Sequence, residues 1–180
     1  FTIMAYKYPN LITYSEIENN GLMGKFFEDL KDMTVEVKSE VSKDVVVNNL
    51  EIGNKLPLTV IAGPCQIESM DHALFMCGSL MEIGNELGVN IIYKSSFDKA
   101  NRSSVKGARG IGLENSVEIF SRIKKDFGCS ITTDVHDAVQ AKILSHYVDI
   151  LQIPAFLCRQ TDLLKAAALT GAVINVKKGQ

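Results

Sequence analysis

Basic and polar residues concentrate in one stretch of the chain, Lys94 to Ser104, which reads KSSFDKANRSS. If the apolar run before it is a strand that continues, Lys94, Ser96 and Asp98 lie on one face, because side chains alternate along a strand. Further positive side chains are predicted to meet them at one opening: Lys99, Arg102, Lys106, Arg109, Arg159 and Lys177. This concentration of charge suits a small molecule that carries phosphate and carboxylate groups.

A solvated basic loop is an equal alternative for any one of these lysines. The group as a whole favours ligand binding, because Lys94 and Lys177 fall inside runs that predict buried strands. A charge in a buried strand needs a partner. A phosphate or carboxylate group of a ligand would supply it.

Five short apolar runs predict the strands of a parallel sheet that is buried on both faces. They are Leu58–Ala62, Asn90–Ser95, Ser130–Asp134, Ile150–Ile153 and Ala172–Val176. Upstream of them, Val45–Val47 and Leu50–Ile52 predict a short opening hairpin.

Helical periods fill the gaps between these runs. In the first, apolar residues recur from Met70 to Met81, behind Ser69 as the N-cap. Three further helices are predicted: Leu113–Phe127, about Asp137 to Tyr147, and about Thr161 to Leu169. Gly128 would end the first of these three, and Gly171 would end the last.

The resulting order is a strand followed by four helix–strand units, which predicts right-handed parallel crossovers. Because no Gly-x-Gly-x-x-Gly follows the first strand, a dinucleotide-binding domain is disfavoured. A (β/α)₈ TIM barrel, an α/β fold, is the better interpretation. Such barrels typically need about 250 residues, so residues 44–180 are predicted to be the N-terminal portion of one. Residues 1–43 form a separate segment of unknown role, with a weak helix over Ser15–Asp32.

Composition narrows the class of protein. The 180 residues include 19 Lys and Arg against 21 Asp and Glu, for a formal net charge of −2. A nucleic-acid partner is therefore not expected. No membrane span is expected either, because the longest apolar run, Leu56–Ala62, is far too short. Without a visible signal peptide the chain is predicted to be cytoplasmic, although it begins at Phe1 and an upstream piece could be missing.

Polar groups follow each predicted strand, where βα barrels carry their functional residues. They include Gly63-Pro64-Cys65, Asp134-Val135-His136, Gln152 to Arg159 and Lys177-Lys178. Of the 4 cysteines, Cys77 and Cys129 are predicted to be free buried thiols, since no CxxC pair occurs.

Four of these segments closely resemble one known family. KSSFDKANRSS, TTDVHD (132–137), QIPAFLCRQTDLL (152–164) and NVKKGQ (175–180) are similar to 3-deoxy-D-manno-octulosonate 8-phosphate synthase. The resemblance runs from about Val45 to Gln180. It implies a homotetrameric barrel transferase that condenses phosphoenolpyruvate with arabinose 5-phosphate, releases phosphate, and serves lipopolysaccharide (KDO) biosynthesis.

The resemblance also implies site residues. Lys99, Lys177 and Asp134 would be the catalytic residues, with the two lysines holding phosphoenolpyruvate. The substrate-binding residues would be Lys94, Ser96, Asn101, Arg102, Ser103, Gln152, Ala155, Phe156 and Arg159. Among these, Arg102 and Ser103 would grip the sugar phosphate from a neighbouring subunit.

One position separates two classes within the family. Metal-independent members carry Asn where this chain has Cys65, in the string IAGPCQIES. The resemblance therefore implies a divalent metal ion, such as zinc or iron, bound by the Cys65 thiolate. The remaining ligands are expected beyond Gln180. A buried structural thiol is the alternative for Cys65.

Two other interpretations compete with this one. The sister synthase of the shikimate pathway uses erythrose 4-phosphate, but it carries Lys-Pro-Arg-Thr where this chain has Lys99-Ala100-Asn101-Arg102-Ser103. A non-catalytic fragment is the second, because an open half-barrel exposes unpaired strand edges. We expect the functional chain to extend about 100 residues beyond Gln180, given the usual size of such barrels.

Overall fold

The structure is a computed structural model that describes residues 44–100, 104 and 106–179. The predicted N-terminal segment, 1–43, and its weak helix Ser15–Asp32 lie outside the described residues, as do Asn101, Arg102 and Ser103.

The described part begins with the predicted hairpin. Strands β1 (Val45–Val47) and β2 (Leu50–Ile52) pair antiparallel across a two-residue turn. Asn48, in that turn, has a φ of 53°, a left-handed conformation that Asn tolerates better than most residues. Val47 is buried against Ile92 and Ile150 of the main sheet, so the hairpin packs on that sheet.

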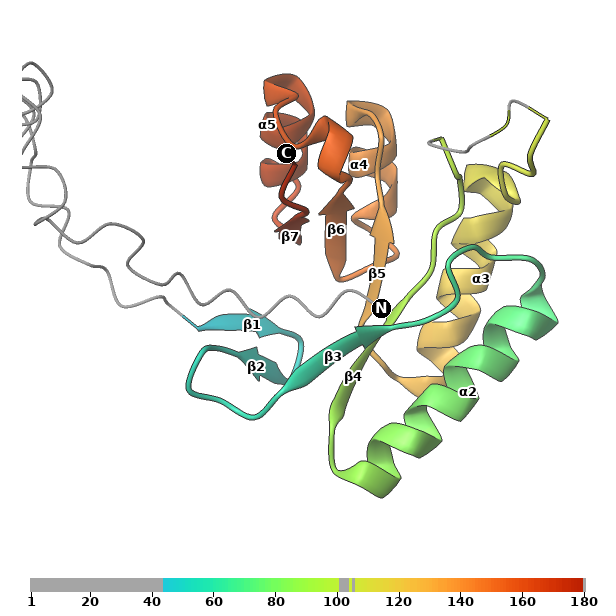
Figure 1. Ribbon diagram of the computed structural model, residues 1–180, viewed down its shortest axis with the longest axis vertical. Coiled ribbons are helices and arrows are strands. Elements are labelled where there is room, and N and C mark those ends of the chain that lie inside the picture. The colour runs from blue at the N-terminus through green and yellow to red at the C-terminus, as the bar shows by residue number, and fades with distance from the viewer. Residues whose placement is uncertain (1–43, 101–103, 105, 180) are drawn as a thin grey trace, which may run out of the picture. The chain divides into compact units, whose positions relative to one another are not determined.

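Five parallel strands form the main sheet in the order of the chain (Figure 1). They are β3 (Thr59–Ala62), β4 (Asn90–Lys94), β5 (Ile131–Asp134), β6 (Ile150–Ile153) and β7 (Val173–Val176). The predicted strands are confirmed, each to within one residue at its ends. Parallel strands in consecutive order, each joined to the next through a helix, give a curled half-barrel, as in a partial TIM barrel.

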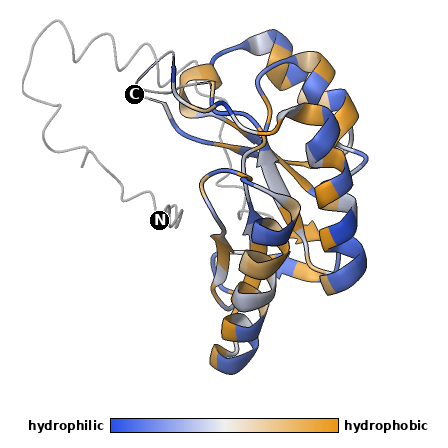
Figure 2. Ribbon diagram, turned by 90° about the vertical axis from the view of Figure 1, so that its right-hand side faces the viewer, coloured by the Kyte–Doolittle hydropathy of each residue, from blue (hydrophilic) through white to orange (hydrophobic). Residues whose placement is uncertain are grey.

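Four α-helices connect these strands: α2 (Met70–Leu87), α3 (Gly112–Phe127), α4 (Ala138–Leu144) and α5 (Thr161–Ala168). The Ser69 hydroxyl accepts a hydrogen bond from the His72 backbone N–H at 3.1 Å, which confirms the predicted N-cap. Gly88 and Gly128 end α2 and α3 in left-handed conformations. Figure 2 shows apolar and polar residues alternating around the helices, as expected of elements with one buried face.

Two details differ from the prediction. Helix α4 ends at Leu144 rather than near Tyr147, because His146 and Tyr147 donate to carbonyls three residues back and tighten the last turn. A 3₁₀ turn, η2 (Ala155–Leu157), follows Pro154 and was not predicted.

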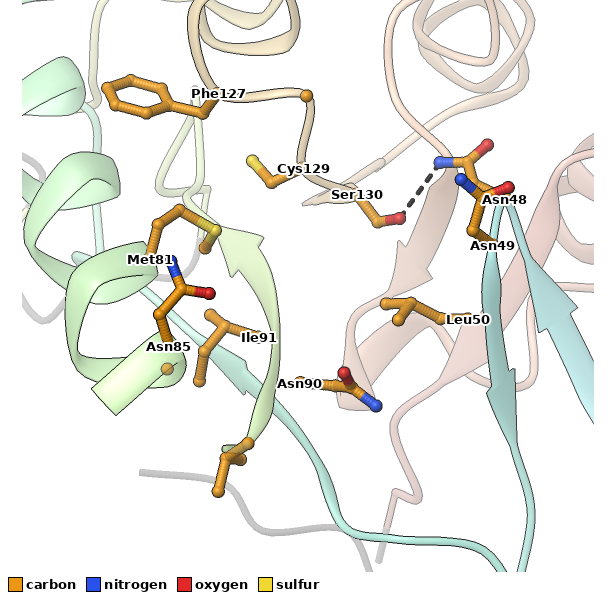
Figure 3. A pocket seen from close by; sticks show the side chains of 13 residues that line it. Asn48, Asn49, Leu50, Met81, Asn85, Asn90, Ile91, Phe127, Cys129 and Ser130 are labelled. Atoms are coloured by element: carbon orange, nitrogen blue, oxygen red, sulfur yellow. Dashed lines mark hydrogen bonds between the residues drawn. The ribbon is translucent and has the colours of Figure 1, made fainter. Parts of the chain in front are cut away.

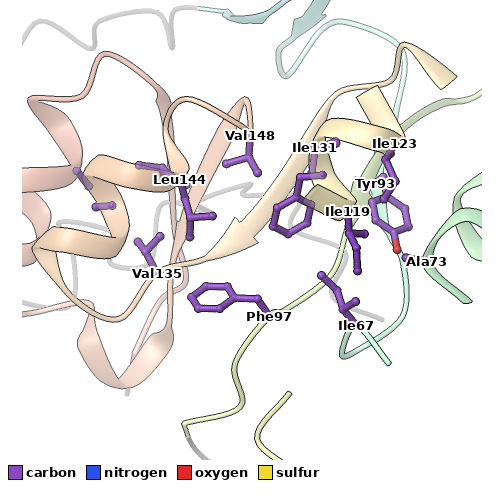
Figure 4. Close-up of a cluster of buried hydrophobic side chains, with 14 of the residues drawn as sticks. Ile67, Ala73, Tyr93, Phe97, Ile119, Ile123, Ile131, Val135, Leu144 and Val148 are labelled. Atoms are coloured by element: carbon purple, nitrogen blue, oxygen red, sulfur yellow. The ribbon is translucent and has the colours of Figure 1, made fainter. Parts of the chain in front are cut away.

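The main hydrophobic core lies between the helices and the sheet (Figure 4). Tyr93 and Ile131 of the sheet meet Phe120 and Ile123 of α3 there, all fully buried. Cys77 is buried and Cys129 is half-buried, and both are free thiols with their sulfur atoms 3.6 Å apart. None of the helices in the described part is long and apolar enough to cross a membrane.

Gly63 sets the spacing where β3 ends. A Cβ atom at this position would lie only 1.8 Å from the backbone oxygen of Lys94, so no larger residue fits. The close approach continues past Cys65, where Ile67 N–H donates to the Ser96 carbonyl at 2.9 Å. This contact holds Cys65 beside the end of β4.

Candidate functional site

The carboxyl ends of β4 and β5 bring a lysine, a serine and an aspartate together. Lys94 is the last residue of β4, and Asp134 is the last residue of β5. The Ser96 hydroxyl donates to Asp134 Oδ1 at 2.6 Å and accepts from Lys94 Nζ at 2.7 Å. Lys94 Nζ is also 3.2 Å from Asp134 Oδ1. The predicted partner of the buried lysine is thus supplied within the chain, by Asp134.

A second lysine completes this network. Lys99 Nζ donates to the Ser96 hydroxyl at 3.0 Å, from the loop that follows β4. Lys99 also hydrogen-bonds the Cys65 thiol, which lies at the end of β3. We call Lys94, Ser96, Lys99 and Asp134 the strand-end network. It places two ammonium groups around one carboxylate, which leaves positive charge available for an anionic ligand.

The charges in the network change one another's pKa. Burial alone would raise the pKa of Asp134, but a hydrogen bond from His136 and the positive charge of Lys94 hold it well below its usual range. Burial lowers the pKa of Lys94, and the charge of Asp134 opposes that shift. The two residues therefore stabilise each other in their charged forms.

The neighbouring strands extend this row of polar groups. The register pairs Asp134 with Gln152 and Gln152 with Asn175, so these three residues lie side by side across β5, β6 and β7. The Asn175 amide donates to Gln152 Oε1 at 3.4 Å. Sequence reasoning did not single out Asn175. Asn175 could have been predicted from its position two residues before Lys177, because alternate residues of a continuing strand lie on the same face.

Other predicted residues lie around this row. Lys177 is half-buried, and its backbone N–H donates to the Ile153 carbonyl at 3.0 Å, which continues the pairing of β7 with β6. Ala155 lies in η2, while Phe156 is 82% exposed and Arg159 is exposed. In the described part of the chain, neither Phe156 nor Arg159 contacts the strand-end network through a hydrogen bond or ion pair.

Asp98 takes a different position from the one that strand alternation predicts. Strand β4 ends at Lys94, so the chain has left the sheet before it reaches Asp98. There Asp98 binds Arg109 through two hydrogen bonds of 2.8 and 2.7 Å. It also faces His136, whose other ring nitrogen, Nε2, lies 3.6 Å from Asp134 Oδ2.

Cys65 has the properties of a metal ligand. The Cys65 thiol is exposed, and its pKa is lowered mainly by the hydrogen bond with Lys99, which favours the thiolate form that binds metals. Among the residues that the structure describes, no group of three His, Cys, Asp or Glu side chains is placed to hold a metal ion.

Two cavities lie away from the strand-end network. One, of about 260 Å³, lies at the amino end of the sheet beside the hairpin (Figure 3). Asn48 donates there to the Ser130 hydroxyl at 3.0 Å, and the lining residues include no charged side chain. The second, of about 310 Å³, lies on the other side of the hairpin. The uncharged lining of the first cavity does not suit an anionic substrate, whereas the strand-end network does.

Comparison with known proteins shows which family the chain belongs to. Residues 32–180 match the DAHP synthetase I family. The chain is similar to three bacterial proteins named 2-dehydro-3-deoxyphosphooctonate aldolase: it is 56% identical to that of Rickettsia bellii over 140 residues, 59% to that of Rickettsia prowazekii over 140, and 58% to that of Bartonella henselae over 142. These alignments cover 78–79% of the chain and 51% of each relative, so the chain spans about half the length of these relatives.

Proposed function

The chain belongs to the DAHP synthetase I family, and from this we propose that its full-length protein condenses phosphoenolpyruvate with D-arabinose 5-phosphate. The products would be 3-deoxy-D-manno-octulosonate 8-phosphate, a precursor of lipopolysaccharide, and inorganic phosphate. The observation that carries the proposal is the strand-end network, in which Lys94 and Lys99 surround Ser96 and Asp134. The similarity to proteins named 2-dehydro-3-deoxyphosphooctonate aldolase supports the choice of reaction.

The first task of such a site is to hold two anionic substrates together against their repulsion. Lys99 and Lys177 would bind phosphoenolpyruvate, assisted by Arg159 and the backbone at Ala155. Lys94, Asn101 and Asp134 would face the sugar, and Arg102 and Ser103 would bind its phosphate. Ser96, Gln152 and Phe156 would complete the rim. Fixed positive groups of this kind lower the barrier because they need no rearrangement as the reaction proceeds.

The second task is to form one carbon–carbon bond and break one carbon–oxygen bond. C3 of phosphoenolpyruvate attacks the aldehyde carbon of the open-chain sugar, whose oxygen takes up a proton. A water molecule adds its hydroxyl group at C2, and its other proton balances the one taken up by the former aldehyde oxygen. The bond between C2 and the phosphate oxygen then breaks, and the C2 hydroxyl becomes a ketone as its proton leaves with the phosphate. In this scheme Asp134 keeps the Lys94 ammonium charged and in place, 3.2 Å away.

The choice of sugar phosphate provides a direct test of the function. Because the loop reads Lys99-Ala100-Asn101 rather than Lys-Pro-Arg, we expect arabinose 5-phosphate to be preferred over erythrose 4-phosphate. The measurement is phosphate release from phosphoenolpyruvate by the full-length protein with each sugar. Faster release with erythrose 4-phosphate would assign the sister reaction instead.

We further propose that Cys65 is one ligand of a divalent metal ion, such as zinc or iron. Its exposed thiol and lowered pKa suit this role, and the other ligands would come from outside the described residues. When bound, such an ion supplies positive charge that can polarise a carbonyl oxygen.

The metal proposal predicts distinct effects for two substitutions. Activity should disappear on chelation and return with zinc or iron. Cys65→Ser should lower activity at least about 100-fold, since it removes the thiolate ligand. Cys65→Asn should keep some activity that chelators do not affect, and Cys129→Ser, at the other end of the sheet, is the matched control. Full activity of Cys65→Ser in the presence of chelator would contradict the metal role.

The proposal also includes assembly and location. We propose a cytoplasmic homotetramer in which Arg102 and Ser103 of one subunit complete the site of another. Exposed apolar side chains on the helices support association: Phe75 and Leu87 on α2 are each 70% exposed, and Val139 on α4 is 65% exposed.

A further inference from the structure

Arg109 closes the base of the loop that joins β4 to α3. Its guanidinium group donates from Nε and Nη2 to the two carboxylate oxygens of Asp98, at 2.8 and 2.7 Å. Its backbone carbonyl accepts from the Lys99 N–H at 2.5 Å. One residue thus fixes both the side chain of Asp98 and the backbone of Lys99, the residue that reaches the strand-end network.

The backbone that follows Arg109 packs closely against the backbone of Phe97. Gly110 has a φ of 120°, and a Cβ atom there would lie 2.2 Å from the Phe97 carbonyl oxygen. Gly112 N–H also donates to that carbonyl, at 3.3 Å. The two ends of the loop are therefore held together by backbone contacts on one side and by the Asp98–Arg109 pair on the other.

Asp98 connects this pair to the network through His136. The His136 ring lies between two carboxylates, with Nδ1 3.8 Å from Asp98 Oδ2 and Nε2 3.6 Å from Asp134 Oδ2. Its side chain is 15% exposed, and Nδ1 is buried without a hydrogen-bond partner among the described residues. The Asp98 carboxylate is therefore the charged group that lies beside the buried Nδ1 atom of His136.

We propose that Arg109 is a positioning residue for the reaction: by binding Asp98 through both oxygens and Lys99 through its carbonyl, it holds His136 and the Lys99 ammonium in their places beside Asp134. The predicted effect on turnover rests on the proposed function. The predicted effect on the Lys99 backbone does not depend on that function.

The proposed role depends on the planar guanidinium group, which can donate two parallel hydrogen bonds to one carboxylate. A lysine at this position keeps the positive charge but cannot donate two parallel hydrogen bonds to one carboxylate. The Arg109 side chain is 59% exposed, whereas that of Asp98 is 12% exposed, so Arg109→Lys, which keeps a cation beside Asp98, should cost little stability. A large effect of Arg109→Lys on turnover with little effect on melting temperature would therefore indicate positioning.

The test compares full-length wild-type protein with Arg109→Lys, Arg109→Ala and the control Arg122→Ala. Arg122 is 54% exposed and pairs with Asp126 at 2.6 Å on α3, so it matches Arg109 in exposure and chemistry. We expect kcat to fall about 10- to 100-fold in both Arg109 variants, the range found when supporting residues around a site are lost. The KM values should change little in both variants, the melting temperature should change little in Arg109→Lys, and Arg122→Ala should behave as wild type.

Two further readouts separate positioning from a structural role. Millimolar guanidinium chloride should restore part of the kcat of Arg109→Ala, whereas ammonium chloride at equal ionic strength should not. Hydrogen exchange at the Lys99 amide should become about 10-fold faster in Arg109→Ala, since its bond to residue 109 loosens.

The outcomes are distinct. Unchanged kcat and unchanged Lys99 exchange would overturn the proposal. A loss of kcat that tracks a loss of melting temperature, without rescue by guanidinium, would overturn it as well. If the wild-type protein does not release phosphate from the two substrates, the proposed function fails, and exchange at Lys99 alone decides whether Arg109 holds this residue.

Discussion

Asp134→Asn is expected to destabilise the protein by about 3 kcal/mol at neutral pH and to remove nearly all activity. The carboxylate is buried, 3.2 Å from Lys94 Nζ, and accepts a hydrogen bond from Ser96. Removing one partner of a buried ion pair leaves the other charge uncompensated, which costs about 3–5 kcal/mol. Lys94, whose pKa burial already lowers, would lose the charge that opposes that shift. Urea denaturation, together with phosphate release, would measure both effects.

The stability difference between wild type and Asp134→Asn should decrease as the pH falls. Burial opposes the charged form of Asp134, but His136, Lys94 and Ser96 lower its pKa in the folded protein below the ordinary value of 3.8. The carboxylate therefore contributes its full stability above that value and loses it as the pH falls through the folded pKa. The difference between wild type and Asp134→Asn should be constant near neutral pH and shrink below about pH 4.

Asp126→Asn is the matched control for this substitution. Asp126 pairs with Arg122 one helical turn away, and both side chains are substantially exposed. We expect less than about 0.5 kcal/mol from its loss. Equal destabilisation by the two substitutions, or a difference for Asp134→Asn that does not change in acid, would show that the buried pair lacks the role given to it.

Lys99→Met is the second substitution with a large expected effect. It removes the ammonium group that donates to Ser96 at 3.0 Å and keeps most of the side-chain volume. Loss of one preorganised donor to developing charge typically costs 10²- to 10³-fold in rate, and we expect a loss of about that size in kcat/KM for phosphoenolpyruvate. Lys142→Met, at an exposed position on α4, is the control and should leave turnover unchanged.

This substitution has a consequence that does not depend on the reaction. The Lys99 ammonium is the main cause of the lowered pKa of Cys65, so Lys99→Met should raise that pKa and leave less thiolate at neutral pH. Alkylation of Cys65 in metal-free protein should then slow, measured by mass spectrometry with Cys158 as the internal reference. An unchanged rate at Cys65 would show that Lys99 does not reach the thiol.

The regular elements were predictable because their signals are local. Each buried parallel strand is a short apolar run, and each was found to within one residue. The N-cap at Ser69 and the left-handed end at Gly128 followed from residue type alone. The gathering of Lys94 and Asp134 followed from the fold, since both end strands that are neighbours in one parallel sheet.

Details of the site depend on contacts between residues that are far apart in the sequence or in loops, and these contacts could not be predicted from local patterns. The partner of Lys94 was expected in a ligand, whereas Asp134 supplies it within the chain. Strand alternation placed Asp98 with Lys94, but the strand ends earlier and Asp98 turns to Arg109. Arg109 looked like one more basic loop residue, because only the closed base of the loop shows what it binds. The residues expected to grip the sugar phosphate, Arg102 and Ser103, lie outside the described residues.

The most direct test of the proposed condensation is phosphorus NMR of the full-length protein with phosphoenolpyruvate and arabinose 5-phosphate. The phosphoenolpyruvate signal should give way to inorganic phosphate while the arabinose 5-phosphate signal gives way to one new sugar phosphate, in equal amounts. Neither substrate should change when the other is omitted. Phosphate released without consumption of the sugar, or both signals unchanged in the presence of zinc or iron, would contradict the condensation.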